Sequence, residues 1–540
     1  MSRYELKLGG VQAAVDRRLE AWASEAVGAR LWRRDSSLWS ATPVPELEDR
    51  LGWLELPRTM LGEVAALRAF ADQVRGAGLD RVALLGMGGS SLAPEVFQRS
   101  FGNADGFPEL LVLDSTHPAA VAAAASVLDP RRTLFVVSSK SGGTLETMSL
   151  FRFFWDRCQG RTEDPGQHFV AITDPGSSLE ALARERGLRQ VFPGLPEVGG
   201  RYSALSLFGL LPAALIGVDL ERLLASARDA MTACQQTSGN PGLELGAALG
   251  ELALAGRDKL TFAVSPALAA FPDWLEQLIA ESTGKDGRGI VPVVGEPLAE
   301  PERYGQDRVF FALSLPGEAV DDDRLGRLAA AGHPLLCVTL DDPYDLGAQI
   351  FLWEVAVAAA SVVLGVHPFN QPDVQLAKEM AKRAMASSGV AASTRGPGAT
   401  AADQARLLLE LLGDARGGDY LAIQAFLARG PELDRALAEL QGVVRDRSRL
   451  AVTVGYGPRF LHSTGQLHKG GPASVVSLQL VDSPALEVTV PETDATFNRL
   501  VAAQARGDAD ALRSRGRRVL QLDLGPDPLA ALAALVDGLG

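Results

Sequence analysis

Hydroxyl groups and glycines are concentrated in one short segment that could hold an anion. Residues 138–144 read Ser-Ser-Lys-Ser-Gly-Gly-Thr and stand between a run that predicts a buried strand and a run that predicts a helix. Glycines let the backbone approach a ligand closely, and free amides at a helix N-terminus favour negative charge. Ser139, Ser141 and Thr144 could therefore bind a phosphate monoester. An ordinary helix cap made of polar turn residues is the competing interpretation.

A second glycine-rich turn, Gly86-Met-Gly-Gly-Ser-Ser91, also lies between a predicted strand and a predicted helix. A dinucleotide fingerprint requires Gly where this chain has Ser91, and a nucleotide phosphate loop requires Gly-Lys-Ser/Thr. A nucleotide-dependent kinase or dehydrogenase is therefore disfavoured. The turn follows a strand at the end where open α/β sheets bind ligands, although a simple tight turn explains it equally well.

Two further segments carry charged groups suited to proton transfer. Gln277 and Glu281 lie four residues apart at the margin of an apolar helical stripe, where the carboxylate could act as a base. Arg201, in Gly-Gly-Arg-Tyr-Ser, could donate to an oxyanion. A solvated surface carboxylate and a turn-capping arginine are the competing interpretations.

The segment 455–469 holds two of the six histidines, His462 and His468, among glycines and polar residues. A spacing of six residues suits joint metal ligation poorly, so proton transfer is the better interpretation. The three cysteines are widely spaced and form no zinc pattern, which indicates a reducing compartment. We therefore predict no metal site and no cofactor.

Alternating elements must position these groups. Apolar runs predict strands at 81–85, 110–113, 133–137 and 168–173, and the pattern recurs at 260–264, 309–313 and 334–339. Helical spans between the strands indicate α/β architecture with doubly wound parallel sheets. The predicted units are a helical N-terminal extension, two α/β domains and a C-terminal α/β extension, at 1–70, 71–240, 241–390 and 403–540.

The composition excludes several classes of protein. Of 540 residues, 47% are hydrophobic and 22% are charged, which is typical of a globular chain. Because 66 acidic residues outnumber 52 basic ones, a general nucleic-acid binder is disfavoured. The apolar stretches 204–218 and 355–366 are shorter than the ~18–20 residues that span a bilayer. With no signal-peptide pattern at the start, we expect a cytoplasmic protein that binds no membrane.

Taken together, these segments resemble the glucose-6-phosphate isomerase (phosphoglucose isomerase) family. GMGGSSLAP is similar to the family's GIGGSxLGP, SSKSGGTLET to SKTFTTxET, GGRYS to GGRFS, and QLIAESTGK to QxxxESxGK. FNQPDVQLAK resembles the FDQ…GK segment with the same seven-residue interval from Gln371 to Lys378. The order of these segments over 86–378 is the family's. RLWRRDSSLWS and GYGPRFLHSTGQLHKGGP resemble the isomerase half of bacterial transaldolase/isomerase fusions more specifically.

The resemblance implies two sugar isomerase (SIS) domains and an enzyme of glycolysis and gluconeogenesis. Its reaction would be the reversible isomerisation of glucose 6-phosphate and fructose 6-phosphate through a cis-enediolate. A small sugar phosphate would be the ligand. The residues implied to bind it are Ser139, Ser141 and Thr144 at the phosphate with Lys140 adjacent, Gly89 and Ser90 along the sugar, and Gln277 and Gln371 at its hydroxyls.

The same resemblance implies three catalytic roles. Glu281 would carry the proton between C1 and C2, Arg201 would stabilise the enediolate, and Lys378 would assist ring opening. The family's ring-opening His lies between the Glu and Lys segments in a Gly-Gln-His context, which this chain lacks. His462 is our candidate for that role, with His468 or another group left open. His462 could instead be a substitute that evolved separately, or a structural residue.

Several alternatives stay open. The family His often comes from a neighbouring subunit, which implies a homodimer, whereas a late His segment in the same chain would suit a monomer. A sugar-phosphate sensor without catalysis needs the 139–144 loop but not Glu281, Arg201 and Lys378 together. An isomerase that also accepts mannose 6-phosphate is a further alternative, and so is a separately encoded transaldolase partner.

Overall fold

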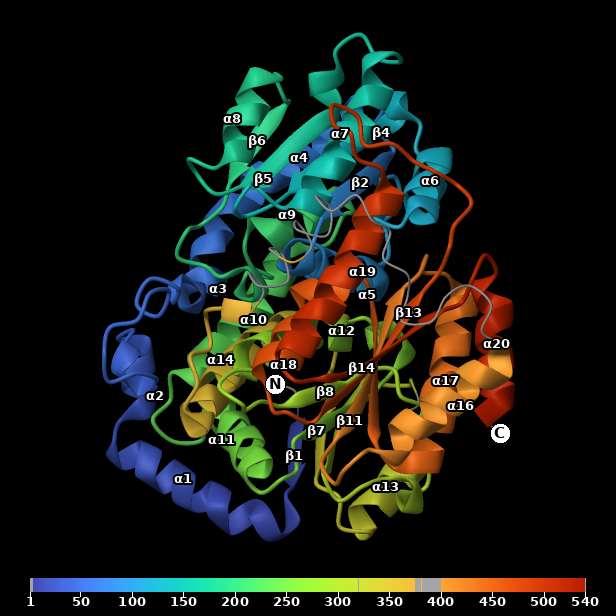
Figure 1. The fold of residues 1–540 in the computed structure, drawn as a ribbon. Coiled ribbons are helices and arrows are strands. Elements are labelled where there is room, and N and C mark those ends of the chain that lie inside the picture. Colours follow the sequence, from blue (N-terminus) through green and yellow to red (C-terminus); the bar gives the residue numbers. More distant parts are fainter. Residues whose placement is uncertain (1–2, 319, 374–379, 381–399, 540) are drawn as a thin grey trace.

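The computed structural model describes residues 3–318, 320–373, 380 and 400–539, which form three sheets flanked by helices (Figure 1). The predicted α/β class with parallel sheets is confirmed. The first sheet and its helices occupy the upper part of Figure 1, and the C-terminal sheet and its helices lie at the lower right.

The first sheet has the strand order β3-β2-β4-β5-β6, and every neighbouring pair is parallel. Gly86 of β2 pairs with Ser138 of β4, so the two glycine-rich turns begin side by side at one edge of the sheet. The elements of this unit are β2 (Arg81–Gly86), β3 (Glu109–Leu113), β4 (Thr133–Ser138), β5 (Phe169–Thr173), β6 (Gln190–Pro193), α4 (Val64–Gly76), α5 (Leu92–Phe101), α6 (Pro118–Val127), α7 (Leu145–Gln159), α8 (Ser178–Glu185) and α9 (Leu207–Leu215).

The second sheet has the order β1-β10-β9-β7-β8. Its elements, with the N-terminal helices, are β1 (Arg3–Lys7), α1 (Gln12–Ser24), α2 (Val27–Trp32), α3 (Leu56–Thr59), α10 (Leu220–Cys234), α11 (Pro241–Leu254), β7 (Lys259–Val264), α12 (Phe271–Thr283), β8 (Val291–Val293), β9 (Arg308–Ser314), α13 (Asp322–Ala330), β10 (Leu335–Thr339) and α14 (Leu346–Leu364). The prediction of a helical N-terminal extension needs a correction, because β1 pairs with β10 in antiparallel register. Its side chains Tyr4 and Leu6, two residues apart, both pack on the core.

Helix α14 is longer than the apolar stretch predicted at 355–366. With the short turn before it, it runs over Pro343–Leu364, and length and composition alone would let it cross a membrane. The fold buries 83% of its most apolar window inside the protein, however. We therefore interpret it as a core helix.

The third sheet is parallel, with the order β12-β11-β13-β14. Its elements are α16 (Ala401–Gly413), β11 (Tyr420–Phe426), α17 (Pro431–Ser448), β12 (Ala451–Tyr456), α18 (Gly465–Gly470), β13 (Val475–Val481), α19 (Phe497–Ser514), β14 (Arg518–Asp523) and α20 (Pro528–Leu539). Helices α16, α17 and α20 lie together, whereas α19 extends up to the first unit (Figure 1). There Phe497 and Leu500 join the hydrophobic core of the first sheet.

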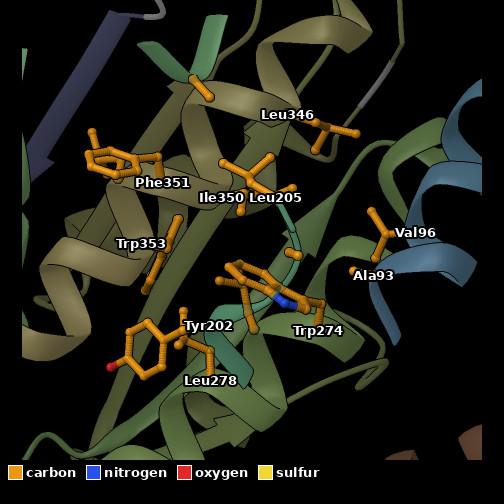
Figure 2. Close-up of a cluster of buried hydrophobic side chains, with 14 of the residues drawn as sticks. Ala93, Val96, Tyr202, Leu205, Trp274, Leu278, Leu346, Ile350, Phe351 and Trp353 are labelled. Atoms are coloured by element: carbon orange, nitrogen blue, oxygen red, sulfur yellow. The ribbon is translucent and has the colours of Figure 1, made fainter. Parts of the chain in front are cut away.

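A shared hydrophobic core lies behind the elements that carry the predicted site. Figure 2 shows Tyr202 and Leu205 gathered with Trp274 and Leu278 of α12 and with side chains of α5 and α14. Each apolar side chain of about this size that is fully buried contributes about 1.5–3 kcal/mol to the stability of the folded protein. Helix α12 and the turn at 199–203 are thereby fixed relative to each other.

Candidate active site

The close approach of two turns brings Arg201 to the edge of the first sheet. Gly89 lies in the turn after β2, and a Cβ there would sit 2.0 Å from the carbonyl oxygen of Gly200. Only glycine allows this contact, because a side chain would overlap the opposite backbone. The predicted sugar-lining residues Gly89 and Ser90 therefore lie directly beside the turn that carries Arg201.

The predicted anion loop lies between β4 and α7. Ser139 is buried, and its hydroxyl lies 3.0 Å from the hydroxyl of Thr144, the residue that precedes the first turn of α7. Ser141 is exposed, and Gly142 adopts φ +71°, a conformation that favours glycine. The hydroxyls of Ser139 and Thr144 thus lie together at the N-terminus of a 15-residue helix, where an anion is favoured, and Ser141 lies exposed in the same loop.

The side chain of Lys140 points away from these hydroxyls. Its ammonium donates to Asp174 Oδ2 at 2.6 Å and to the carbonyl oxygen of Leu195 at 3.0 Å. Burial lowers the pKa of Lys140, and the hydrogen bond with Asp174 acts in the opposite direction. These hydrogen bonds connect the loop to the segment that precedes the Arg201 turn, and in this sense Lys140 braces the loop.

Glu281 and Arg201 face each other in the interior. Glu281 is 7% exposed and Arg201 3% exposed, and Arg201 Nη1 lies 3.5 Å from Glu281 Oε1. The other carboxylate oxygen, Oε2, accepts a hydrogen bond of 3.1 Å from Gln277 Nε2. The four-residue spacing on α12 therefore places Gln277 and Glu281 together, as predicted from the sequence, and adds a cation on the opposite side.

Four hydrogen bonds fix the guanidinium of Arg201. Nε donates to Ser282 Oγ at 2.8 Å and Nη1 to Gln371 Oε1 at 3.1 Å, while Nη2 donates to the carbonyl oxygens of Asn370, at 3.0 Å, and Pro368. A planar guanidinium suits such a multiple contact. The charge is therefore held in place beside Glu281, and Gln371 belongs to the same cluster.

His462 reaches this cluster from the C-terminal unit, which comprises the third sheet and its helices from α16 to α20. Gln277 Nε2 donates to the backbone oxygen of His462 at 2.7 Å. The ring nitrogen Nε2 of His462 lies 3.0 Å from Glu146 Oε1, and Glu146 stands two residues after Thr144 in the first turn of α7. His462 thus lies between Gln277 of α12 and helix α7, which follows the predicted anion loop.

His468, the alternative candidate, is a core residue. It is 3% exposed and lies 3.1 Å through Nδ1 from Gln424 Nε2. Burial lowers the pKa of His468 to about 3. A buried ring with so low a pKa is poorly suited to accept a proton and return it.

Two neighbours of the predicted site residues were missed in the sequence, and one predicted residue is not among those that the structure describes. Glu146 and Ser282 were not singled out, because an acidic residue in a first helical turn and a serine after a glutamate are common. Lys378 lies outside the described residues. Among the residues that the structure describes, no group of three or more His, Cys, Asp or Glu is arranged to hold a metal ion.

Comparisons with known proteins identify the relatives of this chain. A profile of the family described as phosphoglucose isomerase matches residues 65–290. The glucose-6-phosphate isomerase of Rubrobacter xylanophilus is 30% identical over 393 residues, which cover 64% of this chain and 91% of that protein. The enzyme of the same name from Heliobacterium modesticaldum is 31% identical, covering 60% and 84%. The names of these relatives mention no transaldolase, so the narrower resemblance to fusion proteins stays a prediction.

Solved structures share the fold. A hypothetical protein from Thermus thermophilus superposes with a TM-score of 0.60 at 27% identity, over 72% of this chain and 100% of that one. A glucose-6-phosphate isomerase from Chlamydia trachomatis gives a TM-score of 0.54 at 20% identity, over 72% and 80%. The second likeness concerns the fold alone.

Proposed function

The chain belongs to the phosphoglucose isomerase family, and we propose on that basis that it interconverts glucose 6-phosphate and fructose 6-phosphate by proton transfer. The observation that supports this most directly is the buried pair of Glu281 and Arg201, 3.5 Å apart. A carboxylate base and a fixed cation are what the enolisation of a sugar requires. The hydroxyl-bearing loop supplies the site for the phosphate.

The reaction begins with ring opening. The proton of the C1 hydroxyl must leave and the ring oxygen must gain one, so a single group can act first as base and then as acid. His462 is suited to this because Glu146 lies against Nε2 and holds the proton on that nitrogen. The other ring nitrogen, Nδ1, is then the one that accepts and returns the substrate proton. We assign Lys378 an assisting role in this step.

Enolisation follows in the open-chain sugar. The carbonyl at C1 acidifies the C2 proton, which Glu281 removes and delivers to C1. The proton of the C2 hydroxyl passes to the C1 oxygen in the same sequence, so the aldose becomes the ketose with no net change in protons. Negative charge develops on the enediolate oxygen, and Arg201 stabilises it without reorganisation because hydrogen bonds already fix its guanidinium.

The polar residues around this pair orient the sugar. Gln277 Oε1 is buried and has no hydrogen-bond partner among the described residues, so a sugar hydroxyl can satisfy it. Gln371, Gly89 and Ser90 complete the sugar-facing set, and Ser139, Ser141 and Thr144 hold the phosphate. Lys140 contributes by bracing the loop.

A variant at the base tests the proposal. In Glu281→Gln, we expect kcat for glucose 6-phosphate formation from fructose 6-phosphate to fall by about 10²–10⁴-fold. Binding of glucitol 6-phosphate, a reduced analogue that cannot isomerise, should persist in calorimetry. Near wild-type turnover of this variant would refute the assignment of the base, and binding without conversion by the wild type would favour a sugar-phosphate sensor.

Glu354→Gln provides a matched control. Glu354 is a fully buried carboxyl on α14, and burial raises its pKa well above the usual range. The amide therefore replaces a neutral acid of the same shape. We expect wild-type kcat in this variant.

One chain carries the described machinery. His462 comes from the C-terminal unit of the same chain that supplies Glu281 and Arg201. We therefore propose that a single chain is catalytically complete, whether or not it forms a homodimer. Specific activity should stay constant on dilution below any dimer dissociation constant measured by analytical ultracentrifugation, and a proportional loss would contradict this.

We also place the enzyme in the cytoplasm. Its three cysteines are free thiols, two of them buried. Free thiols persist in reducing compartments. Subcellular fractionation with an antibody against the protein would test this assignment.

A further inference from the structure

A buried amide links helix α19 of the C-terminal unit to the contact between Glu146 and His462. Gln504 is 3% exposed, and its Nε2 donates to Glu146 Oε1 at 2.8 Å. The same carboxylate oxygen lies 3.0 Å from Nε2 of His462. One carboxylate oxygen of Glu146 thus contacts both the histidine ring and the glutamine amide, and its position depends on both.

The orientation of the Gln504 amide is fixed from its other end. Thr116, which follows β3 and is fully buried, donates its hydroxyl proton to Gln504 Oε1 at 2.7 Å. A carboxylate accepts hydrogen bonds and cannot donate them, so the amide nitrogen must face Glu146. A flipped amide would place its oxygen against the carboxylate, which makes the observed orientation the favourable one.

Helix α19 is itself anchored on two sides of Gln504. Phe497 and Leu500 pack in the core of the first sheet, and Asp508 Oδ1 forms a buried ion pair of 2.5 Å with Lys469. The glutamine therefore projects from a rigid helix and does not need to be ordered when substrate binds. Such preorganised support is what keeps an acid–base group in its productive geometry.

We propose that Gln504 is a positioning residue for ring opening, which holds Glu146 so that Glu146 holds His462. The inference rests on the proposed function, since it assigns Gln504 to the same site. Gln504 lies outside the segment 65–290 that the family profile matches. The C-terminal unit accordingly contributes both the histidine and the residue that orients the partner of the histidine.

Replacement by leucine removes the donor at nearly the same volume. In Gln504→Leu, we expect kcat to fall about 10–100-fold, the range typical of lost supporting hydrogen bonds, while KM changes less than threefold. Gln504→Glu places a second carboxyl against Glu146, and two such groups share one proton. Its kcat should therefore fall further as pH rises from 6 to 9, a dependence steeper than that of the wild type.

Gln441→Leu is the matched control. Gln441 is 1% exposed and donates to the carbonyl oxygens of Val294 at 3.1 Å and Val452 at 2.6 Å, also joining the C-terminal unit to the rest of the chain. Its loss should lower Tm as much as that of Gln504 while kcat stays within twofold. A purely structural role for Gln504 predicts the same result for both variants.

A double-mutant cycle tests whether Gln504 influences kcat through Glu146. If Gln504 acts through Glu146, adding Gln504→Leu to the Glu146→Gln variant should lower kcat only slightly further. Losses that multiply, or a kcat within twofold of wild type in Gln504→Leu, would overturn the proposal. If the leucine variant does not fold, the pH profile of Gln504→Glu decides alone, and a profile parallel to that of the wild type overturns it. A wild-type chain that fails to convert fructose 6-phosphate refutes the proposed function instead.

Discussion

The ring nitrogen Nε2 of His462 lies 3.0 Å from Oε1 of Glu146, although 316 residues of chain separate the two. One residue belongs to the C-terminal unit and the other to the helix that follows the anion loop. Their contact joins the proposed ring-opening group to the helix that follows the proposed phosphate loop.

Neutralising Glu146 tests the importance of this contact. In Glu146→Gln, the amide can still hydrogen-bond the ring, but it no longer stabilises an imidazolium. We therefore expect kcat to fall about 10–100-fold with KM changed less than threefold. Steady-state kinetics with fructose 6-phosphate over pH 6–9 would measure this. An unchanged kcat would show that His462 does not depend on the carboxylate.

His468→Asn should separate the two histidines. An asparagine oxygen near the position of Nδ1 can accept from Gln424, so the variant should fold with a free energy of unfolding lower by about 1–3 kcal/mol. Because His468 lies in the core, kcat should stay within threefold of wild type. A fall in kcat of tenfold or more in His468→Asn would show that the assignment of the acid–base group is wrong.

The same variant should change acid stability. The pKa of His468 is lowered to about 3 by burial, whereas an unfolded chain has a His pKa near 6.5. Between these values the unfolded state binds more protons, so stability is lost as pH falls from about 6.5. The wild type should lose up to about 1.4 kcal/mol per pH unit more than His468→Asn between pH 6 and 4. Urea unfolding at several pH values would measure the difference.

Local signals explain which parts of the fold could be predicted. The strands β2 and β4 are continuous apolar runs between turn residues, and their predicted positions agree with the structure to within one residue. Strand β8 was missed because it has only three residues and contains a proline. Strand β1 was missed because its partner β10 lies more than 300 residues away, and nothing local indicates that pairing.

Contacts within the site could likewise be predicted between close neighbours in the sequence but not between distant residues. Glu281 and Gln277 are neighbours on one helical turn, so their spacing predicts their contact. The contacts of His462 with Glu146, and of Gln504 with Glu146, depend on how the C-terminal unit docks on the first sheet. Such distant pairings have no signature in residue type or spacing.

The turn at Gly89 gives a test of the backbone geometry. An added Cβ in Gly89→Ala would lie 2.0 Å from the Gly200 carbonyl oxygen, so the two turns must separate. We expect a loss of stability of about 1–3 kcal/mol. The fall in kcat, expressed as an increase in activation free energy, should be larger than this loss, because Arg201 moves with its turn. Gly62→Ala, where the added carbon meets nothing within 4 Å, is the control and should behave as wild type.

Lys140 provides the last test, because its sequence context and its structure suggest different roles. Its ammonium is committed to Asp174 and to the carbonyl oxygen of Leu195, so its removal should chiefly loosen the loop. In Lys140→Met, we expect a loss of about 1–3 kcal/mol in stability, because the half-buried acceptors lose their charged donor. The KM for fructose 6-phosphate should rise less than threefold.

Asp174→Asn separates bracing from direct contact with the phosphate. It weakens the same brace but leaves a cation at position 140 that is free to turn towards the loop. If Lys140 only braces, both variants should lose stability and keep similar KM values. A KM that rises tenfold or more in Lys140→Met, with KM unchanged in Asp174→Asn, would show that the ammonium binds the phosphate directly. In that case the side chain must leave Asp174 when substrate enters.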